Sequence, residues 1–186
     1  MKTSVIVYDR ISTPLGKLFL AVSERGIVRT SFNESLADLL LELKECGFSS
    51  LKYSSPKNEG KNSNEASKSA RLMFERVSRQ VDLYFNGKLS ALDKLPVHAE
   101  GTEFQQDVWS ALRKIPAGDT ESYGELAEKI GRQRASRAVG TACRDNPLVL
   151  IVPCHRVISK DRSLNGFRGG INLKAKLLQH EGANFN

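Results

Sequence analysis

Hydrophobic and polar positions in the first half of the chain predict a small sheet accompanied by helices. Two apolar runs within residues 17–32 flank a polar, glycine-containing turn at 23–26, and this pattern predicts a β-hairpin. An amphipathic stretch over 35–46 predicts a short helix. A second helical pattern covers 70–88 and is expected to end at Gly87. The apolar positions of this second pattern are Leu72, Val77, Val81 and Phe85.

The segment between these two helices, residues 47–69, changes in composition to Ser, Lys, Asn, Glu, Gly and Pro. Such a composition favours a solvated loop over a packed element, so we expect a loop there. Residues 89–101 then connect to a second half with a different pattern. We therefore expect two domains, residues 1–98 and 99–186.

The second half is predicted to be mainly helical. A first helix over 102–115 has Thr102 as a plausible N-terminal cap. Its apolar face consists of Phe104, Val108, Trp109 and Leu112, and the tryptophan is expected in the core. Ser122 and Glu125 have the spacing of a capping box, which predicts a helix over 122–131.

A further helical segment, residues 134–144, follows after a short turn. Its apolar positions fall on one face: Ala135, Ala138, Val139 and Ala142. Its polar positions fall on the other: Arg134, Arg137, Thr141 and Arg144. This pattern is typical of a helix-turn-helix, in which a short turn joins two helices and the second helix has small packing residues and an arginine stripe. Other helical hairpins with basic outer faces share the pattern. A closing helix over 172–182 is expected to turn its leucines inward.

The positive charge of the chain is concentrated in one segment. The net charge is +7, and residues 129–168 hold nine basic and two acidic residues, so the rest of the chain is balanced. A basic segment can be a solvated face, but this one surrounds an unusual cysteine motif and therefore favours an anionic partner such as nucleic acid. The first residues contain no signal-peptide core, and three scattered cysteines fit a reducing compartment, so an intracellular protein is expected.

The motif is LIVPCHRVIS, residues 150–159, in which an apolar run leads directly to Cys154, His155 and Arg156. A buried structural thiol would not account for the two basic neighbours. A metal site would need further ligands at suitable spacing. Neither CxxC nor HxxxH spacing occurs among Cys46, Cys143, His98 and His180. A nucleophile requires a general base or a neighbouring positive charge, which His155 and Arg156 could supply, with Glu181 as the group that orients the base. Local chemistry favours the nucleophile modestly.

Several segments, in this order, resemble one known family. They are FQQDVWSALRKIPAGDTESYGELAEKIG (104–131), RAVGTACRDNP (137–147), IVPCHRVI (151–158) and LLQHEG (177–182). The family is the O6-alkylguanine-DNA alkyltransferases, also called methylated-DNA–protein-cysteine methyltransferases. The resemblance is strong over residues 102–182, and the N-terminal half is similar only in its order of elements.

The resemblance implies an α/β fold, with a small N-terminal antiparallel sheet and helices (ribonuclease-H-like), and a mainly helical C-terminal domain containing a helix-turn-helix. It implies DNA repair by direct reversal: the alkyl group of O6-alkylguanine in double-stranded DNA moves irreversibly to Cys154, once per molecule, after the base is flipped out from the minor groove. O4-alkylthymine is an open second substrate. No cofactor and no metal are expected. The protein is expected to be a monomer that can cluster along DNA, in the cytoplasm or, in a eukaryote, the nucleus.

The resemblance also implies roles for individual residues. Cys154 is the nucleophile, His155 its base through a bound water, and Glu181 the acid that orients the base. Tyr123 donates a proton toward the departing guanine. Asn146 braces the turn between the recognition helix and the active site.

On the DNA side, Arg137 is implied to take the place of the flipped base, and small residues on its helix to permit close approach to the minor groove. Further DNA contacts are expected at Tyr123, Gly124, Ala135, Arg132, Arg134 and Lys160. The pocket for guanine and its alkyl group is expected to include Val157, Phe167 and Gly169. The sequence departs from the family at Phe167, where many relatives have tyrosine, and at Arg168, where the residue is often small. Two rivals stay open: a DNA-binding module with an incidental cysteine, and a hydrolase using a Cys/His pair.

Overall fold

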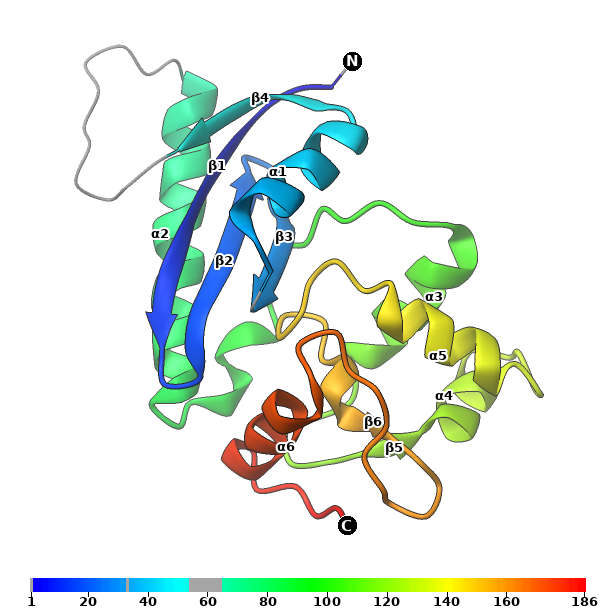
Figure 1. Cartoon of the computed structure of the whole chain (residues 1–186). Helices are drawn as coiled ribbons and strands as arrows, with labels where there is room; N and C mark the ends of the chain where they lie inside the picture. The colour runs from blue at the N-terminus through cyan, green and yellow to red at the C-terminus, as the bar shows by residue number, and fades with distance from the viewer. Residues whose placement is uncertain (1, 33, 54–64) are drawn as a thin grey trace. The chain divides into compact units, whose positions relative to one another are not determined.

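The computed structural model describes residues 2–32, 34–53 and 65–186 and separates into two compact units (Figure 1). The first unit covers Met1–Ala99 and the second Glu100–Asn186. No helix among the described residues is long and apolar enough to cross a membrane.

The first unit contains a four-stranded sheet in the order β3-β2-β1-β4. Its strands are β1 (Lys2–Thr13), β2 (Gly16–Ser23), β3 (Gly26–Phe32) and β4 (Phe48–Tyr53). The first three strands pair antiparallel, which confirms both the small antiparallel sheet and the predicted hairpin. The fourth strand pairs parallel with β1, so the complete sheet is mixed.

Strand β4 lies within residues 47–69, where the sequence predicted a loop. That prediction is wrong for Phe48–Tyr53, and also for the end of the segment, because helix α2 begins at Glu65. Residues 54–64 of the predicted loop lie outside the described residues. The composition of this segment does not indicate a strand. Strand β4 is held instead by backbone pairing with β1, which is distant in sequence, and by the ring of Phe48, which is 1 % exposed.

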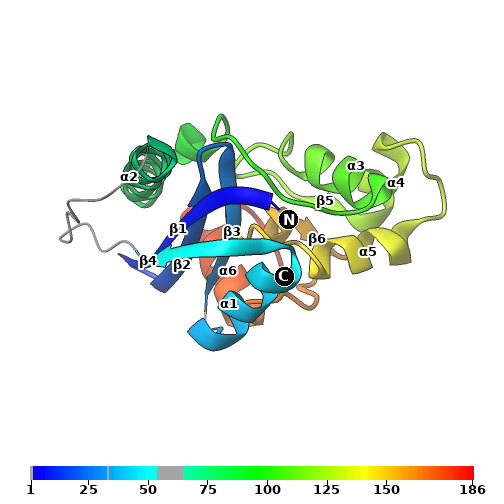
Figure 2. The ribbon, with the colours of Figure 1, turned by 90° about the horizontal axis from the view of Figure 1, so that it is seen from above.

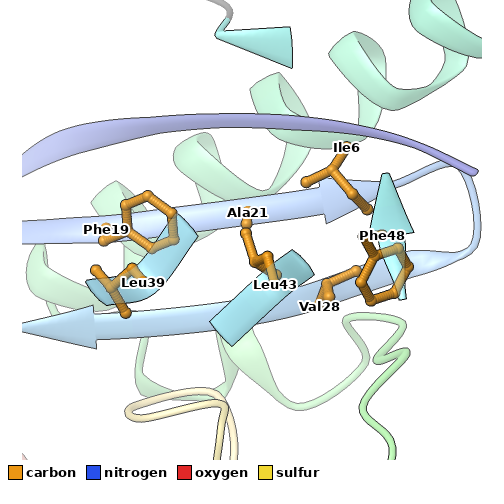
Figure 3. Packing of buried hydrophobic residues seen from close by; sticks show 7 residues of the cluster. All are labelled: Ile6, Phe19, Ala21, Val28, Leu39, Leu43 and Phe48. Atoms are coloured by element: carbon orange, nitrogen blue, oxygen red, sulfur yellow. The ribbon is translucent and has the colours of Figure 1, made fainter. Parts of the chain in front are cut away.

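Two helices lie on opposite faces of this sheet, as the two views in Figures 1 and 2 show. Helix α1 (Leu36–Glu45) begins at the N-cap Ser35, whose hydroxyl accepts a hydrogen bond from the Asp38 amide. Figure 3 shows how its leucines pack on side chains from all four strands. The members of this cluster are Ile6, Phe19, Ala21, Val28, Leu39, Leu43 and Phe48. Burial of this apolar surface gives the first unit a core of its own.

Helix α2 (Glu65–Phe85) buries the predicted face only in part: Val77 and Val81 are buried as expected, and the rest of the face differs. Its buried positions are Ala70, Phe74, Val77, Val81 and Tyr84. Leu72, expected on the inner face, is 58 % exposed. Two overlapping apolar stripes are present in the sequence, and the sheet selects the one that carries Phe74 and Tyr84 because aromatic rings bury the larger area. The helix ends at Phe85, and Gly87, which has a φ of +92°, follows as the predicted stop.

The second unit is mainly helical. Helix α3 (Glu103–Leu112) is followed by β5 (Glu121–Ser122), α4 (Tyr123–Lys129), α5 (Ser136–Arg144), the short 3-10 helix η2 (Cys154–Arg156), β6 (Val157–Ile158) and α6 (Ile171–His180). Thr102 caps α3 as predicted, there as part of a capping box with Gln105, and the predicted capping box at Ser122 starts α4. Trp109 lies in the core, and its indole N–H donates to the carbonyl of Ala142 at 2.9 Å, which ties α3 to α5.

Helices α4 and α5 lie side by side and form the predicted helix-turn-helix (Figure 1). The inner face of α5 differs in part from the prediction, because Ala138 is exposed whereas Cys143 is buried with Val139 and Ala142. Strands β5 and β6 pair in parallel, with Ser122 opposite Ile158. This pairing places the start of α4 beside the end of the cysteine motif.

Gly26 provides a test of the first unit. It has a φ of +147°, and a Cβ there would lie 2.7 Å from the carbonyl oxygen of Pro96. Gly26→Ala should therefore lower the free energy of unfolding by roughly 2–4 kcal/mol, from backbone strain and the forced shift of Pro96. The matched control is Gly16→Ala, which has a φ of +115° with no atom within 4 Å of the added Cβ and isolates the strain. Equal losses in urea titrations would contradict the steric contribution of Pro96.

Candidate active site around Cys154

Cys154 lies within a buried stretch, residues 148–158, and opens the short helix η2. The residue is only 4 % exposed. Backbone hydrogen bonds hold the approach to it: the Val152 amide donates to Leu148 and the Cys154 amide donates to Val152, both at 2.8 Å. Leu150 has a φ of +80°, a left-handed conformation that costs a non-glycine residue about 1 kcal/mol or more. The surrounding contacts therefore impose this bend on the chain.

Asn146 supplies many of those contacts. Its side-chain oxygen accepts from the Leu148 amide at 2.9 Å, and its amide nitrogen donates to the Val152 carbonyl at 2.8 Å and to the Cys154 sulfur at 3.1 Å. One buried side chain thus bridges the end of α5, the bend and the thiol. This geometry matches the bracing position expected for Asn146.

Three further groups form a buried network behind the thiol. Glu181, at the C-terminal end of α6, receives two hydrogen bonds from Arg156, from Nε at 2.9 Å and Nη2 at 2.7 Å. The Nη1 of Arg156 donates to the carbonyl of Ile115 at 2.6 Å. His155 Nε2 lies 3.1 Å from Glu181 Oε1, and both side chains are fully buried. The charge of Arg156 is therefore neutralised by Glu181 and does not act directly on the thiol, contrary to the expectation from sequence.

The network fixes the tautomer of His155. Burial would raise the pKa of Glu181, but hydrogen bonds and charges from His155 and Arg156 together hold that pKa well below its usual range. An ionised carboxylate can only accept, so the Nε2 of His155 carries the proton. Burial lowers the pKa of His155, which keeps the ring neutral. The lone pair then resides on Nδ1, a buried atom with no hydrogen-bond partner among the described residues. His155 is thus arranged to accept a proton at Nδ1.

Cys154 also has a cationic neighbour that sequence reasoning missed. Lys174 on α6 is fully buried, and its ammonium group donates to the Val157 carbonyl at 2.6 Å. Burial raises the pKa of the Cys154 thiol, whereas the hydrogen bond from Asn146 and the charge of Lys174 act in the opposite direction. The spacing held a signal, because Lys174 lies three, four and seven residues before Leu177, Leu178 and Glu181 and so shares their inner face.

The thiol opens into a cavity of about 500 Å³. The residues that line it are Tyr123, Gly140, Cys143, Arg144, Cys154, Gly166, Phe167 and Arg168. Burial, with smaller contributions from the two cysteines, raises the pKa of Tyr123 to about 12. Its phenol is therefore protonated at neutral pH and can donate. A Cβ on Gly140 would lie 3.8 Å from the Tyr123 ring, so glycine at this position leaves space beside the phenol.

Other predicted site residues lie elsewhere. Val157 is fully buried and does not line the cavity, and Gly169 is also absent from its wall. The place of these two residues in the guanine and alkyl pocket therefore stays a prediction. Gly169 instead supports the wall, since a Cβ there would lie 3.1 Å from the Phe167 ring.

The remaining candidates form no part of the cavity. Four arginine and lysine side chains are exposed: Arg132, Arg134, Arg137 and Lys160. Gly124 and Ala135 are half-buried at the starts of α4 and α5. Among the described residues, no group of three or more His, Cys, Asp or Glu is placed to hold a metal ion.

The buried His155 gives a pH-dependent stability. Its folded pKa lies below its unfolded value of about 6.5, so the unfolded state binds more protons and stability falls as pH drops below about 6.5. The slope should approach about 1.4 kcal/mol per pH unit. Glu181, whose pKa is also lowered, adds a loss only below about pH 4.3. Denaturant titrations of His155→Gln between about pH 6.5 and 5 should show a flatter profile. His180→Gln is the control and should keep the slope; an unchanged slope in His155→Gln would contradict the assignment.

Comparison with known proteins places this site in a family. Residues 103–183 match the DNA binding domain of 6-O-methylguanine DNA methyltransferase, and residues 6–99 match the ribonuclease-like domain of the same family. The chain is 37% identical over 182 residues to a methylated-DNA–protein-cysteine methyltransferase of Shigella flexneri, covering 95% of this chain and 96% of the relative. It is 38% identical over 174 residues to one of Methanosarcina barkeri, covering 94% and 96%.

Solved structures agree. The crystal structure of Mycobacterium tuberculosis OGT in complex with DNA superimposes with a TM-score of 0.72 at 32% identity, covering 95% of this chain and 92% of that chain. The match extends over both units and includes the ribonuclease-like fold expected for the first. The chain therefore belongs to the 6-O-methylguanine DNA methyltransferase family.

Proposed function

We propose that this protein repairs DNA by moving the alkyl group of O6-alkylguanine from double-stranded DNA to its own Cys154. One observation carries the proposal: in a chain of this family, the Cys154 thiol lines a cavity and is followed directly by a histidine whose tautomer leaves Nδ1 free to accept a proton. Displacement at an alkyl carbon needs a strong, soft nucleophile, which a thiolate supplies.

In this mechanism a water carries the thiol proton to Nδ1 of His155. Adjacent side chains seldom contact each other directly, and the sulfur accepts its hydrogen bond from Asn146. Glu181 orients the ring through Nε2 and stabilises the imidazolium that forms, while Arg156 keeps Glu181 ionised. Lys174 favours the developing thiolate by its charge. Each partner of the base thus has one function.

Tyr123 completes the reaction on the side of the leaving group. As the bond between the alkyl carbon and O6 breaks, guanine gains negative charge and needs a proton. The phenol of Tyr123 lines the same cavity as Cys154 and remains protonated at neutral pH. We assign it the donor role. Phe167, also in the wall, can stack on the base.

The product is a thioether on Cys154, which water does not hydrolyse. No described residue near the sulfur offers a route back to the thiol. One molecule should therefore accept one alkyl group and then be spent, which makes the protein a stoichiometric reagent.

The helix-turn-helix supports a DNA-bound geometry in which the guanine leaves the stack. Arg137 is exposed on α5, and the small side chains of Ala135 and Ala138 flank it along the helix. We propose that α5 enters the minor groove, that Arg137 occupies the space of the flipped base, and that the neighbouring cations bind phosphates. The proposed phosphate neighbours are Arg132, Arg134, Lys160 and the backbone at Gly124.

Some properties extend the proposal beyond this site. We propose that the protein acts as a monomer, that it clusters along DNA, and that O4-alkylthymine is a second substrate. A cytoplasmic location, or a nuclear one in a eukaryote, fits the three free cysteines, Cys46, Cys143 and Cys154.

The decisive measurement is the intact mass of the protein after incubation with a duplex containing O6-methylguanine. One methyl group should be gained, mapped to Cys154, and the reaction should saturate at one per molecule. Cys154→Ala should gain none and still bind DNA, while Cys143→Ala, which removes the other thiol of the cavity, controls for the site of transfer. Binding without a mass gain would indicate a lesion-binding module, and repeated turnover a hydrolase.

The role of Arg137 can be separated from the chemistry. Arg137→Ala should slow repair of duplex DNA by about tenfold or more, because no side chain then occupies the space that the flipped base leaves in the DNA. Its reaction with free O6-benzylguanine should change much less. Arg79→Ala is the control: it removes an exposed arginine from α2 in the first unit. Equal losses on both substrates would rule out the finger role.

A further inference from the structure

We propose that Phe185 and Asn186 are positioning residues for the reaction at Cys154, because they fix the loop that carries Phe167 in the cavity wall. This inference rests on the proposed function and specifies what holds the flipped guanine in place. Phe167 is the ring assigned to stack on that guanine, so its position has to be fixed before the alkyl carbon can meet the sulfur. Neither Phe185 nor Asn186 has a part in the mechanism above.

One wall of the cavity lies on a loop that contains neither helix nor strand. This loop, residues 159–170, connects β6 to α6 and contributes Gly166, Phe167 and Arg168 to the lining. We call it the wall loop. Binding residues on a loop of this length are positioned by the scaffold around it. The contacts that reach the wall loop from outside therefore decide where Phe167 lies.

Contacts with the start of α6 hold the second half of the wall loop. The Gly170 amide donates to the Phe167 carbonyl at 2.8 Å, and the Leu173 amide donates to the Gly170 carbonyl at 3.1 Å. Gly169 permits close packing between them, because a Cβ there would lie 2.5 Å from Leu173 Cδ2. The backbone on the C-terminal side of Phe167 is thus tied to α6.

Hydrogen bonds with residues 183–186, which follow α6, hold the first half of the wall loop. The Asn186 amide donates to the Arg162 carbonyl at 2.9 Å, and the Asn186 side chain donates to the Asp161 carbonyl at 2.8 Å. Arg162 Nη2 donates in return to the Asn184 carbonyl. Arg162 has a φ of +66°, a strained conformation that persists where surrounding contacts impose it. These hydrogen bonds are the contacts that impose it.

Apolar packing adds to these hydrogen bonds. Phe185 and Leu164, a residue of the wall loop, pack against the same buried cluster. The members of this cluster are Ile158, Leu178 and Ala183. An aromatic ring buries a large apolar area, so loss of the Phe185 ring would open the cluster and loosen the wall loop at Leu164.

Movement of the wall loop would be transmitted to Phe167. The ring of Phe167 lies edge-on to the ring of His155, with 6.4 Å between the ring centroids and 82° between the planes. A displaced Phe167 would offer guanine a poorer stacking surface, and a smaller fraction of the flipped guanine would then lie in the reacting geometry. The thiol would keep its own support, because Asn146 donates to the Cys154 sulfur from outside the wall loop.

Phe185 and Asn186 could instead contribute only to the stability of the second unit, and three measurements separate the two roles. The first is the limiting rate of methyl transfer from a duplex containing O6-methylguanine at saturating protein, followed by intact mass. The second is the affinity for an unmodified duplex, from fluorescence anisotropy. The third is the rate at which iodoacetamide alkylates Cys154, which requires no guanine. All are made at a temperature at which urea titrations show that every variant is folded.

We expect Phe185→Ala to lower the limiting transfer rate by about fivefold, because the guanine loses part of its stacking on Phe167. The affinity for the unmodified duplex should stay the same, and alkylation by iodoacetamide should not slow. Asn186→Ala removes one hydrogen bond and should lower the transfer rate less. Phe185→Leu should restore most of the rate, since leucine refills the cluster. Phe85→Ala is the control: it removes a half-buried phenylalanine from α2 in the first unit.

A double-mutant cycle with Phe167→Ala decides whether Phe185 acts through Phe167. In the Phe167→Ala background, Phe185→Ala should change the transfer rate much less than it does in wild type. The same fold-loss in both backgrounds would overturn the inference, and so would a parallel slowing of iodoacetamide alkylation.

The outcomes also distinguish this inference from the function beneath it. If the wild-type protein transfers no methyl group to Cys154, the proposed function itself is wrong. If the wild-type protein transfers the group and Phe185→Ala does so at the same rate, the positioning role is wrong and the repair function stands.

Discussion

The active site depends on one buried ion pair, between Arg156 and Glu181. A carboxylate at the C-terminal end of a helix is disfavoured by the helix dipole, and burial makes its charge more costly still. Two hydrogen bonds from Arg156 compensate for both. The ionised carboxylate then sets the tautomer of His155, which directs the free lone pair to Nδ1. Loss of Arg156 would leave the buried charge of Glu181 without its cationic partner. This would destabilise the fold of this region and disturb the orientation of His155.

The surroundings of Cys154 both shield the thiol and prepare it to react. Burial raises the pKa of Cys154 and limits the access of other electrophiles to its sulfur. Asn146 and Lys174 are placed to stabilise the thiolate once a base has taken the proton. Such an arrangement suits the single reaction proposed for this thiol. Specificity then depends on the cavity, whose wall contributes a phenol, an aromatic ring and two arginines.

Part of this arrangement followed from local patterns. The hairpin, the capping boxes and the leucines of α6 were predictable because their signals lie within a few residues. Strand β4 was not predictable in this way, because its stability comes from pairing with β1, about 45 residues earlier in the chain. The buried face of α2 was predicted only in part for a related reason: two overlapping apolar stripes share Val77 and Val81, and contact with the sheet decided which other positions are buried.

The sequence alone predicted a nucleophile at Cys154 and determined its neighbours in the chain, because a motif of adjacent residues and its resemblance to a family carry that information. Only the tertiary structure decided what each charge does. Arg156 lies two residues after Cys154 in the sequence, yet its charge is neutralised by Glu181. Lys174 lies twenty residues after Cys154, and its positive charge is the one that acts to lower the pKa of the thiol. Val157 is buried and does not line the cavity, whereas Arg168 does. The effect of a charge on a group depends on the distance between them and on their burial, and the order of residues in the sequence determines neither.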